Sequence, residues 1–98
     1  MLSDEECRVA ARAAWDYHEA GRLPSEVLCE RRGHVARNAD GGETEACTAA
    51  RLEVAAVLGI TPTRHLNLLL TEPRTLARRL LSTLGETPEH LGWGDDPG

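Results

Sequence analysis

Apolar residues recur along the chain with a spacing close to 3.6, which is the period of one face of an α-helix. The first such stretch begins after Ser3, a residue suited to cap a helix, and ends at Gly21. Because its apolar face is rich in alanine, we expect a neighbouring helix to approach it closely. The side chains on this face are Cys7, Ala10, Ala11, Ala14, Trp15, Tyr17 and His18.

The same pattern predicts four more helices, most of them bounded by proline near the start or glycine at the end. They cover residues 24–32, 44–58, 61–70 and 73–84. The helix at 44–58 is apolar around most of its circumference, so the pattern predicts that it is the central element of the fold. Between residues 34 and 43 the pattern dissolves into Asn, Asp and Gly, which predicts a mobile surface loop.

No segment shows the sustained alternation of apolar and polar residues that marks a strand. The chain has only three aromatic residues, Trp15, Tyr17 and Trp93, so its core must be built from Leu, Val and Ala. The sequence therefore predicts an all-α fold, a compact bundle of about five helices, some of them short. Residues 1–92 are expected to form one helical domain, followed by a C-terminal tail at 93–98.

One part of this bundle has the features of a known motif. Residues 51–70, RLEVAAVLGITPTRHLNLLL, contain a small residue at Ala55, a turn glycine at Gly59 and a capped second helix from Thr61. Gly59 permits the left-handed backbone of a tight turn, and Ala55 allows two helices to cross closely. The segment resembles a helix-turn-helix unit, and it predicts a helical hairpin near residues 45–70.

The resemblance implies that Thr63, Arg64 and Asn67 project from the outward side of the second helix. In DNA-binding units this side enters the major groove, where Arg pairs with guanine and Asn with adenine. The chain departs from the motif at one place, because His65 stands where an apolar residue is usual and Leu66 follows it. The alternative is a hairpin that only packs.

Charge is distributed unevenly along the chain, whose formal net charge is −5. Residues 51–80 carry a net charge of +3, and the segments on either side are acidic. A negative protein has no global field that draws it to nucleic acid. Arg74 and Arg78 lie four residues apart, so they could contact phosphates or an acidic partner, or form a solvated helix flank. All eleven basic residues are Arg, a bias that fits a GC-rich coding genome.

The positions of cysteine and histidine give little indication of a catalytic site or a metal-binding site. Only Cys29 and His34 have a ligand-like spacing, and a zinc site would need further ligands such as Cys7, Cys47 or His18. The sequence has no glycine-rich phosphate loop. We therefore expect free, buried thiols, no bound metal, no cofactor and no enzymatic activity.

The sequence has neither the features of a secretory signal nor an apolar run long enough to span a bilayer, so we expect a cytoplasmic protein without membrane contact. We expect a small regulatory or adaptor protein that binds another protein, with a second copy of itself as one option. The alternative is a helix-turn-helix DNA-binding regulator. No small-molecule substrate is indicated. The candidate residues for binding a partner or nucleic acid are Thr63, Arg64, Asn67, Arg74 and Arg78.

Overall fold

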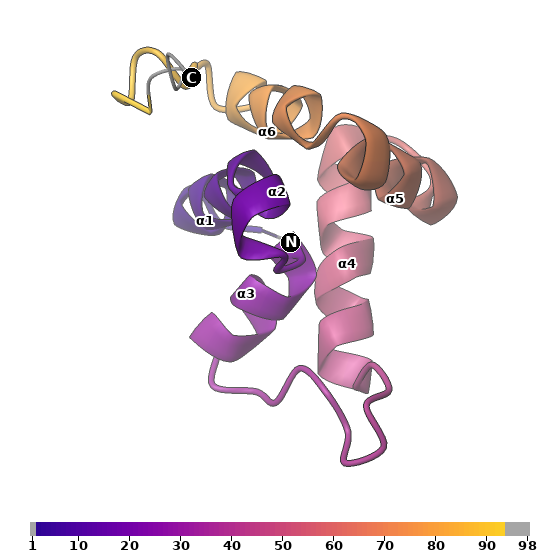
Figure 1. Cartoon of the computed structure of the whole chain (residues 1–98). Coiled ribbons are helices and arrows are strands. Elements are labelled where there is room, and N and C mark those ends of the chain that lie inside the picture. The colour runs from indigo at the N-terminus through magenta and orange to yellow at the C-terminus, as the bar shows by residue number, and fades with distance from the viewer. Residues whose placement is uncertain (1, 94–98) are drawn as a thin grey trace.

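The computed structural model describes residues 2–93, and this part of the chain contains six α-helices and no β-strand. The all-α bundle predicted from the sequence is therefore confirmed (Figure 1). The helices are α1 (Asp4–Trp15), α2 (Tyr17–Ala20), α3 (Pro24–Arg31), α4 (Glu45–Leu58), α5 (Pro62–Thr71) and α6 (Pro73–Ser82).

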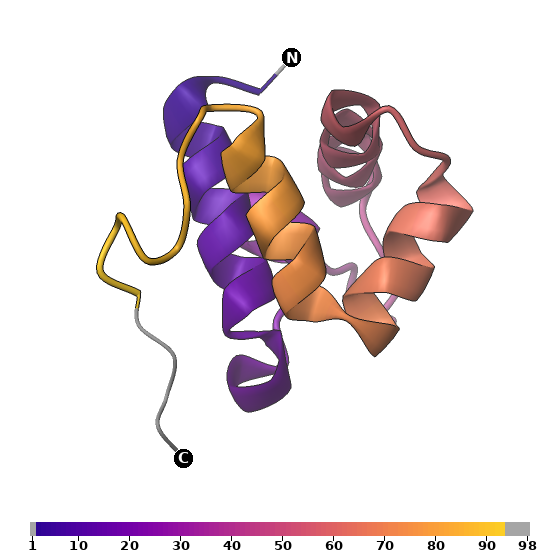
Figure 2. The same cartoon turned by 90° about the horizontal axis from the view of Figure 1, so that it is seen from above.

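The central helix is α1, which packs most extensively against α6 and also against α3. Figure 2 shows α6 lying alongside α1, with α4 and α5 on the other side of α6. The prediction that the helix at 44–58 is central was wrong. The physical reason lies in Ala10, Ala11 and Ala14, which are fully buried and have side chains small enough for two helices to approach α1 closely.

The single helix predicted between Ser3 and Gly21 is broken at Asp16 into α1 and α2. Its start follows the prediction, since the Ser3 hydroxyl accepts from the Glu6 backbone and the Glu6 carboxylate accepts from the Ser3 backbone. Asp16 ends α1 with φ −93° and ψ 5°, and its carboxylate accepts a hydrogen bond from Arg12 at 2.8 Å. Short polar residues such as Asp favour helix ends over helix interiors.

The hairpin of α4 and α5 has the turn that the sequence indicates. Gly59 adopts the left-handed conformation, with φ 67° and ψ 28°. The Ile60 amide donates to the carbonyl of Ala55 at 3.2 Å, which closes the end of α4. The Thr61 hydroxyl accepts from the Arg64 amide at 3.1 Å, so α5 begins with a side-chain cap.

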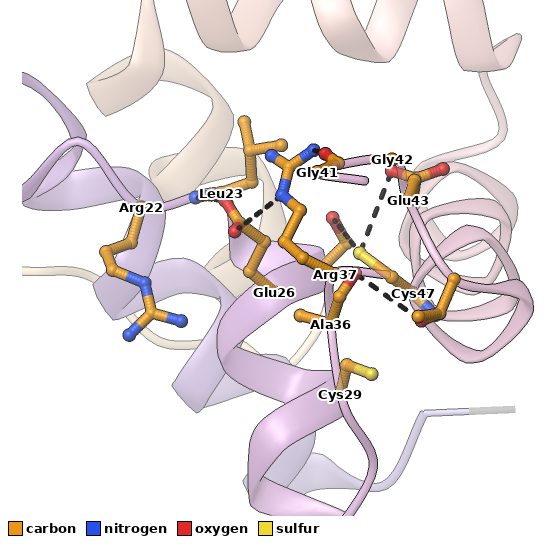
Figure 3. A network of polar contacts seen from close by, with 12 residues as sticks. Arg22, Leu23, Glu26, Cys29, Ala36, Arg37, Gly41, Gly42, Glu43 and Cys47 are labelled. Atoms are coloured by element: carbon orange, nitrogen blue, oxygen red, sulfur yellow. Dashed lines mark hydrogen bonds and ion pairs between the residues drawn. The ribbon is translucent and has the colours of Figure 1, made fainter. Parts of the chain in front are cut away.

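The loop between α3 and α4 has more regular hydrogen bonding than the sequence pattern predicts. The Asn38 amide donates to the carbonyl of Gly42 at 2.7 Å, and the Thr44 hydroxyl donates to the carbonyl of Val35 at 2.6 Å. These bonds hold the loop over a small buried cluster of Cys29, Ala36 and Cys47, separate from the main core (Figure 3).

One arginine joins three helices. The Arg32 guanidinium donates to Glu6 of α1 at 2.6 Å and to both carboxylate oxygens of Glu53 of α4, at 2.7 and 3.2 Å. All three side chains are about three-quarters buried. The bond from Arg32, together with the Ser3 backbone, lowers the pKa of Glu6 to about 2. This network ties the start of α1 and the end of α3 to the middle of α4.

Trp93, placed by the sequence analysis at the start of a C-terminal tail, packs back against the bundle. Its ring centroid lies 6.1 Å from that of Trp15, and the Arg12 guanidinium stands 5.2 Å from its ring. The rest of the tail, residues 94–98, lies outside the described residues. None of the helices in residues 2–93 has the length and apolar character needed to cross a membrane.

Candidate functional site

Helix α5 lies at the outer edge of the bundle in both views and packs against α4 and α6 (Figures 1 and 2). Its inward face is narrow. Only His65 and Leu69 are fully buried, and Leu68 is half-buried beside them. These positions are three and four residues apart, so they form one stripe along the helix. The remaining circumference of α5 faces solvent.

The solvent-facing side of α5 combines the three residues that the sequence singled out with two leucines. Leu66 and Leu70 are 37% and 51% exposed. Thr63, Leu66, Asn67 and Leu70 follow the spacing of a single helix face, and Arg64 lies at its edge. All five side chains are exposed. We call this set, Thr63, Arg64, Leu66, Asn67 and Leu70, the outer α5 face.

The sequence predicts that Thr63, Arg64 and Asn67 face outward, whereas the exposure of the two leucines beside them was not predicted. The reason is that His65 stands where the helix-turn-helix motif usually has an apolar residue. His65 is buried at this inward position, and Leu66 is left in solvent. The signal was present in the sequence. Leu68 and Leu69 lie three and four residues after His65, so they share its face and turn Leu66 outward.

His65 has no hydrogen-bond partner on either ring nitrogen, although it is only 1% exposed. Its pKa is lowered by burial and, to a smaller extent, by the positive charge of Arg51 on α4. Arg51 is itself held by Glu43 at 3.1 Å, and its Nε atom is buried without a partner. The junction of α4 and α5 therefore contains a neutral imidazole beside a cation.

Arg74 and Arg78 do not join the outer α5 face, because both lie against the indole of Trp15 on α1. Their guanidinium carbons stand 4.3 and 5.5 Å from the centroid of that ring. Arg78 also makes two hydrogen bonds to Glu89, at 2.6 and 3.0 Å. These two cations thus stabilise the packing of α6 on α1 and bind groups of their own chain.

The three cysteines are free and buried, as the sequence predicts. The Cys29 thiol donates to the carbonyl of Val35 at 3.4 Å. The Cys47 thiol, labelled in Figure 3, lies 3.7 Å from the hydroxyl of Ser25. Burial raises the pKa of Cys47, which disfavours the nucleophilic thiolate. Within residues 2–93, no three His, Cys, Asp or Glu side chains are arranged to hold a metal ion.

A shallow groove between α1, α2 and α3 has a volume of about 290 Å³ and is lined by Val9, Ala13 and Val27 among others. The charges at its rim are paired within the chain. Arg12 bonds to Asp16, and Arg22 lies 2.6 Å from Glu30. The groove thus presents no free charge from these pairs to orient a ligand.

Comparisons with protein-family models, with curated proteins and with solved structures found no match to this chain.

Proposed function

We propose that this chain is a small regulatory or adaptor protein that binds an apolar surface of another protein through the outer α5 face. The observation that carries the proposal is the exposure of Leu66 and Leu70 on one face of a helix at the edge of the bundle. Full burial of one leucine side chain contributes roughly 1.5 to 3 kcal/mol. Two leucines one turn apart are a suitable anchor for an interface.

The composition of the outer α5 face suits a protein partner better than DNA. Base edges and phosphates are bound by hydrogen-bond donors and cations, whereas this face carries a single charge, at Arg64. Leu66 and Leu70 occupy the positions next to Asn67 where further polar contacts to bases would be needed. Arg74 and Arg78, the other basic candidates, lie against Trp15.

The chemistry of this face indicates what the partner must present. Protein interfaces combine an apolar centre with a polar rim. Here Leu66 and Leu70 supply the centre, and Thr63 and Asn67 supply hydrogen-bonding groups beside it. A complementary partner presents an apolar groove or the apolar stripe of a helix, with polar groups at its margin.

Site-specific photo-crosslinking tests this proposal in the cells that naturally make the chain. A photoreactive residue in place of Leu66 should give one dominant protein adduct, because that position lies in the interface. The same residue in place of His18, which is exposed on α2, should not give that adduct. An adduct between two copies of the chain would identify the protein partner as a second copy.

The adduct's partner then allows affinity to be measured with purified proteins. Leu66→Glu combined with Leu70→Glu should weaken binding at least 100-fold, since two central apolar anchors become charged. Val35→Glu changes an exposed apolar residue in the loop before α4 and should leave the affinity within about threefold. Equal losses in both variants would refute the assignment of the surface.

Duplex DNA is the competing ligand. Micromolar binding that falls steeply with salt, and that Arg64→Ala together with Asn67→Ala abolishes, would overturn the protein-binding proposal in favour of a DNA-binding regulator. Absence of such binding at low salt, together with the crosslink from position 66, would support it.

A further inference from the structure

The imidazole of His65 occupies an unusual place for a titratable group. It lies in the inward stripe of α5, next to Leu69 and Leu68, and is shielded from water. Neither Nδ1 nor Nε2 has a hydrogen-bond partner. A neutral ring can be accommodated in such a site at modest cost, but a protonated ring would be a buried cation without an acceptor.

The charges around this ring do not compensate for a proton. Arg51 of α4 adds a positive field at His65. Glu43 forms an ion pair with the Arg51 guanidinium and accepts a hydrogen bond from the hydroxyl of Thr48. The other charged side chains on the helices that meet here are Glu45 and Glu53 on α4, Arg64 on α5, Glu72 at the junction of α5 and α6, and Arg74, Arg78 and Arg79 on α6.

These groups are either exposed or bound elsewhere. Glu53 pairs with Arg32, and Glu72 accepts from the Thr75 hydroxyl. Glu45 and Arg64 are exposed to solvent. On α6 the charged residues are all arginines, so proton uptake at His65 would add a cation beside a predominantly basic segment of the fold.

We infer that His65 is an acid-sensitive lock between α4 and α5, which holds α5 in place while its ring is neutral and releases it on protonation. The biological consequence rests on the proposed function, because release of α5 would disrupt the outer α5 face and weaken partner binding. The lock itself is a property of the isolated chain and can be tested without a partner.

Release should be local because α5 is attached by few side chains. Only His65 and Leu69 of this helix are fully buried, whereas α6 buries Pro73, Leu76, Ala77, Leu80 and Leu81. An opened α5 would bring the imidazole to water, where its charge is solvated. The packing of α6 on α1 does not include the ring and can persist.

Hydrogen exchange of the backbone amides at residues 62–71, measured by mass spectrometry at pH 7.5 and 5.5, tests this inference. After correction for intrinsic exchange rates, the opening constant of α5 should be several-fold larger at pH 5.5, with about tenfold as the upper limit. This follows from uptake of one proton on opening, with an ordinary histidine pKa of 6.5 in the open state and a lower one in the closed state. Amides of α1 should change less.

Two variants make the result specific. In His65→Leu, which keeps an apolar group of similar size in the stripe, the increase at pH 5.5 should fall below about twofold. In His34→Gln, which alters an exposed histidine in the loop before α4, the increase should remain as large as in the native chain. An undiminished acid response in His65→Leu would overturn the inference, as would an equal response of α1 and α5 in the native chain.

A titration of the unmodified protein by NMR keeps the test decisive if His65→Leu does not fold. The ring resonances of His65 and the amide resonances of α5 should change with the same midpoint, below pH 6.5. Titration of the ring without any response of the α5 amides would refute the lock. Failure of the partner-binding experiment would leave both of these readouts unaffected.

Discussion

Replacement of Leu80 by alanine should lower the free energy of unfolding by about 2 to 5 kcal/mol, the range for a buried leucine truncated in a core. Leu80 is fully buried on the face of α6 that contributes to the main core. The backbone there has little room to close over a cavity, since α1 already approaches through Ala10, Ala11 and Ala14. Urea denaturation followed by circular dichroism measures this loss.

The matched control for this substitution is Leu52→Ala on α4. Leu52 is 46% exposed, so truncation there leaves no cavity and should change the free energy of unfolding by no more than about 0.5 kcal/mol. Similar losses for both variants would contradict the assignment of the core to the interface of α1 and α6.

Replacement of Arg32 by alanine should have the second-largest effect, a loss of about 2 to 3 kcal/mol. Removal of the guanidinium takes away the cation that the carboxylates of Glu6 and Glu53 share, and both side chains are about three-quarters buried. We place the expected value below that of a fully buried pair, because water reaches a quarter of each side chain.

Arg31→Ala is the control for the Arg32 network, since it removes the neighbouring arginine, which is the last residue of α3. Its contact with Glu5 is longer, 3.4 Å, and both side chains are more than half exposed. The free energy of unfolding should change by less than about 0.5 kcal/mol. An equal loss in the two variants would show that the network of Arg32 contributes little of its own.

The same network predicts a dependence of stability on acid. The pKa of Glu6 is about 2 in the folded chain, against an ordinary value of 4.5. Its contribution to stability is therefore complete above pH 4.5 and is lost as the pH falls through that interval toward 2. In Arg32→Ala much of this loss should disappear, because the bond from Arg32 is the main cause of the lowered pKa. Denaturation curves between pH 2 and 6 measure the difference.

Helix positions were predictable because their signals are local. Ser3, Thr44 and Thr61 each cap the helix that follows them, and Gly59 ends α4 in the left-handed conformation. A cap requires only a side chain and a backbone amide a few residues apart, so the sequence contains all the information needed. The break at Asp16 was missed because the apolar pattern runs past it without interruption.

The candidate site was only partly predictable. The resemblance to a helix-turn-helix unit correctly placed Thr63, Arg64 and Asn67 on the outward side of α5. For His65 and Leu66, residue type favours the opposite of the observed burial and exposure, and only the helical spacing of Leu68 and Leu69 indicates the side of α5 that is buried. The binding of Arg74 and Arg78 to Trp15 could not be predicted, because about sixty residues separate the partners.

The sequence by itself determined that this chain is helical, where its main helices start and stop, and which residues flank the turn at Gly59, since these depend on contacts within a few residues. Only the tertiary structure decided that α1 is central, that Arg32 joins three helices and that His65 is sealed beside Arg51. Helices with apolar faces can pack in several ways, and the volumes of side chains distant in sequence, such as Ala14 and Leu80, select among them.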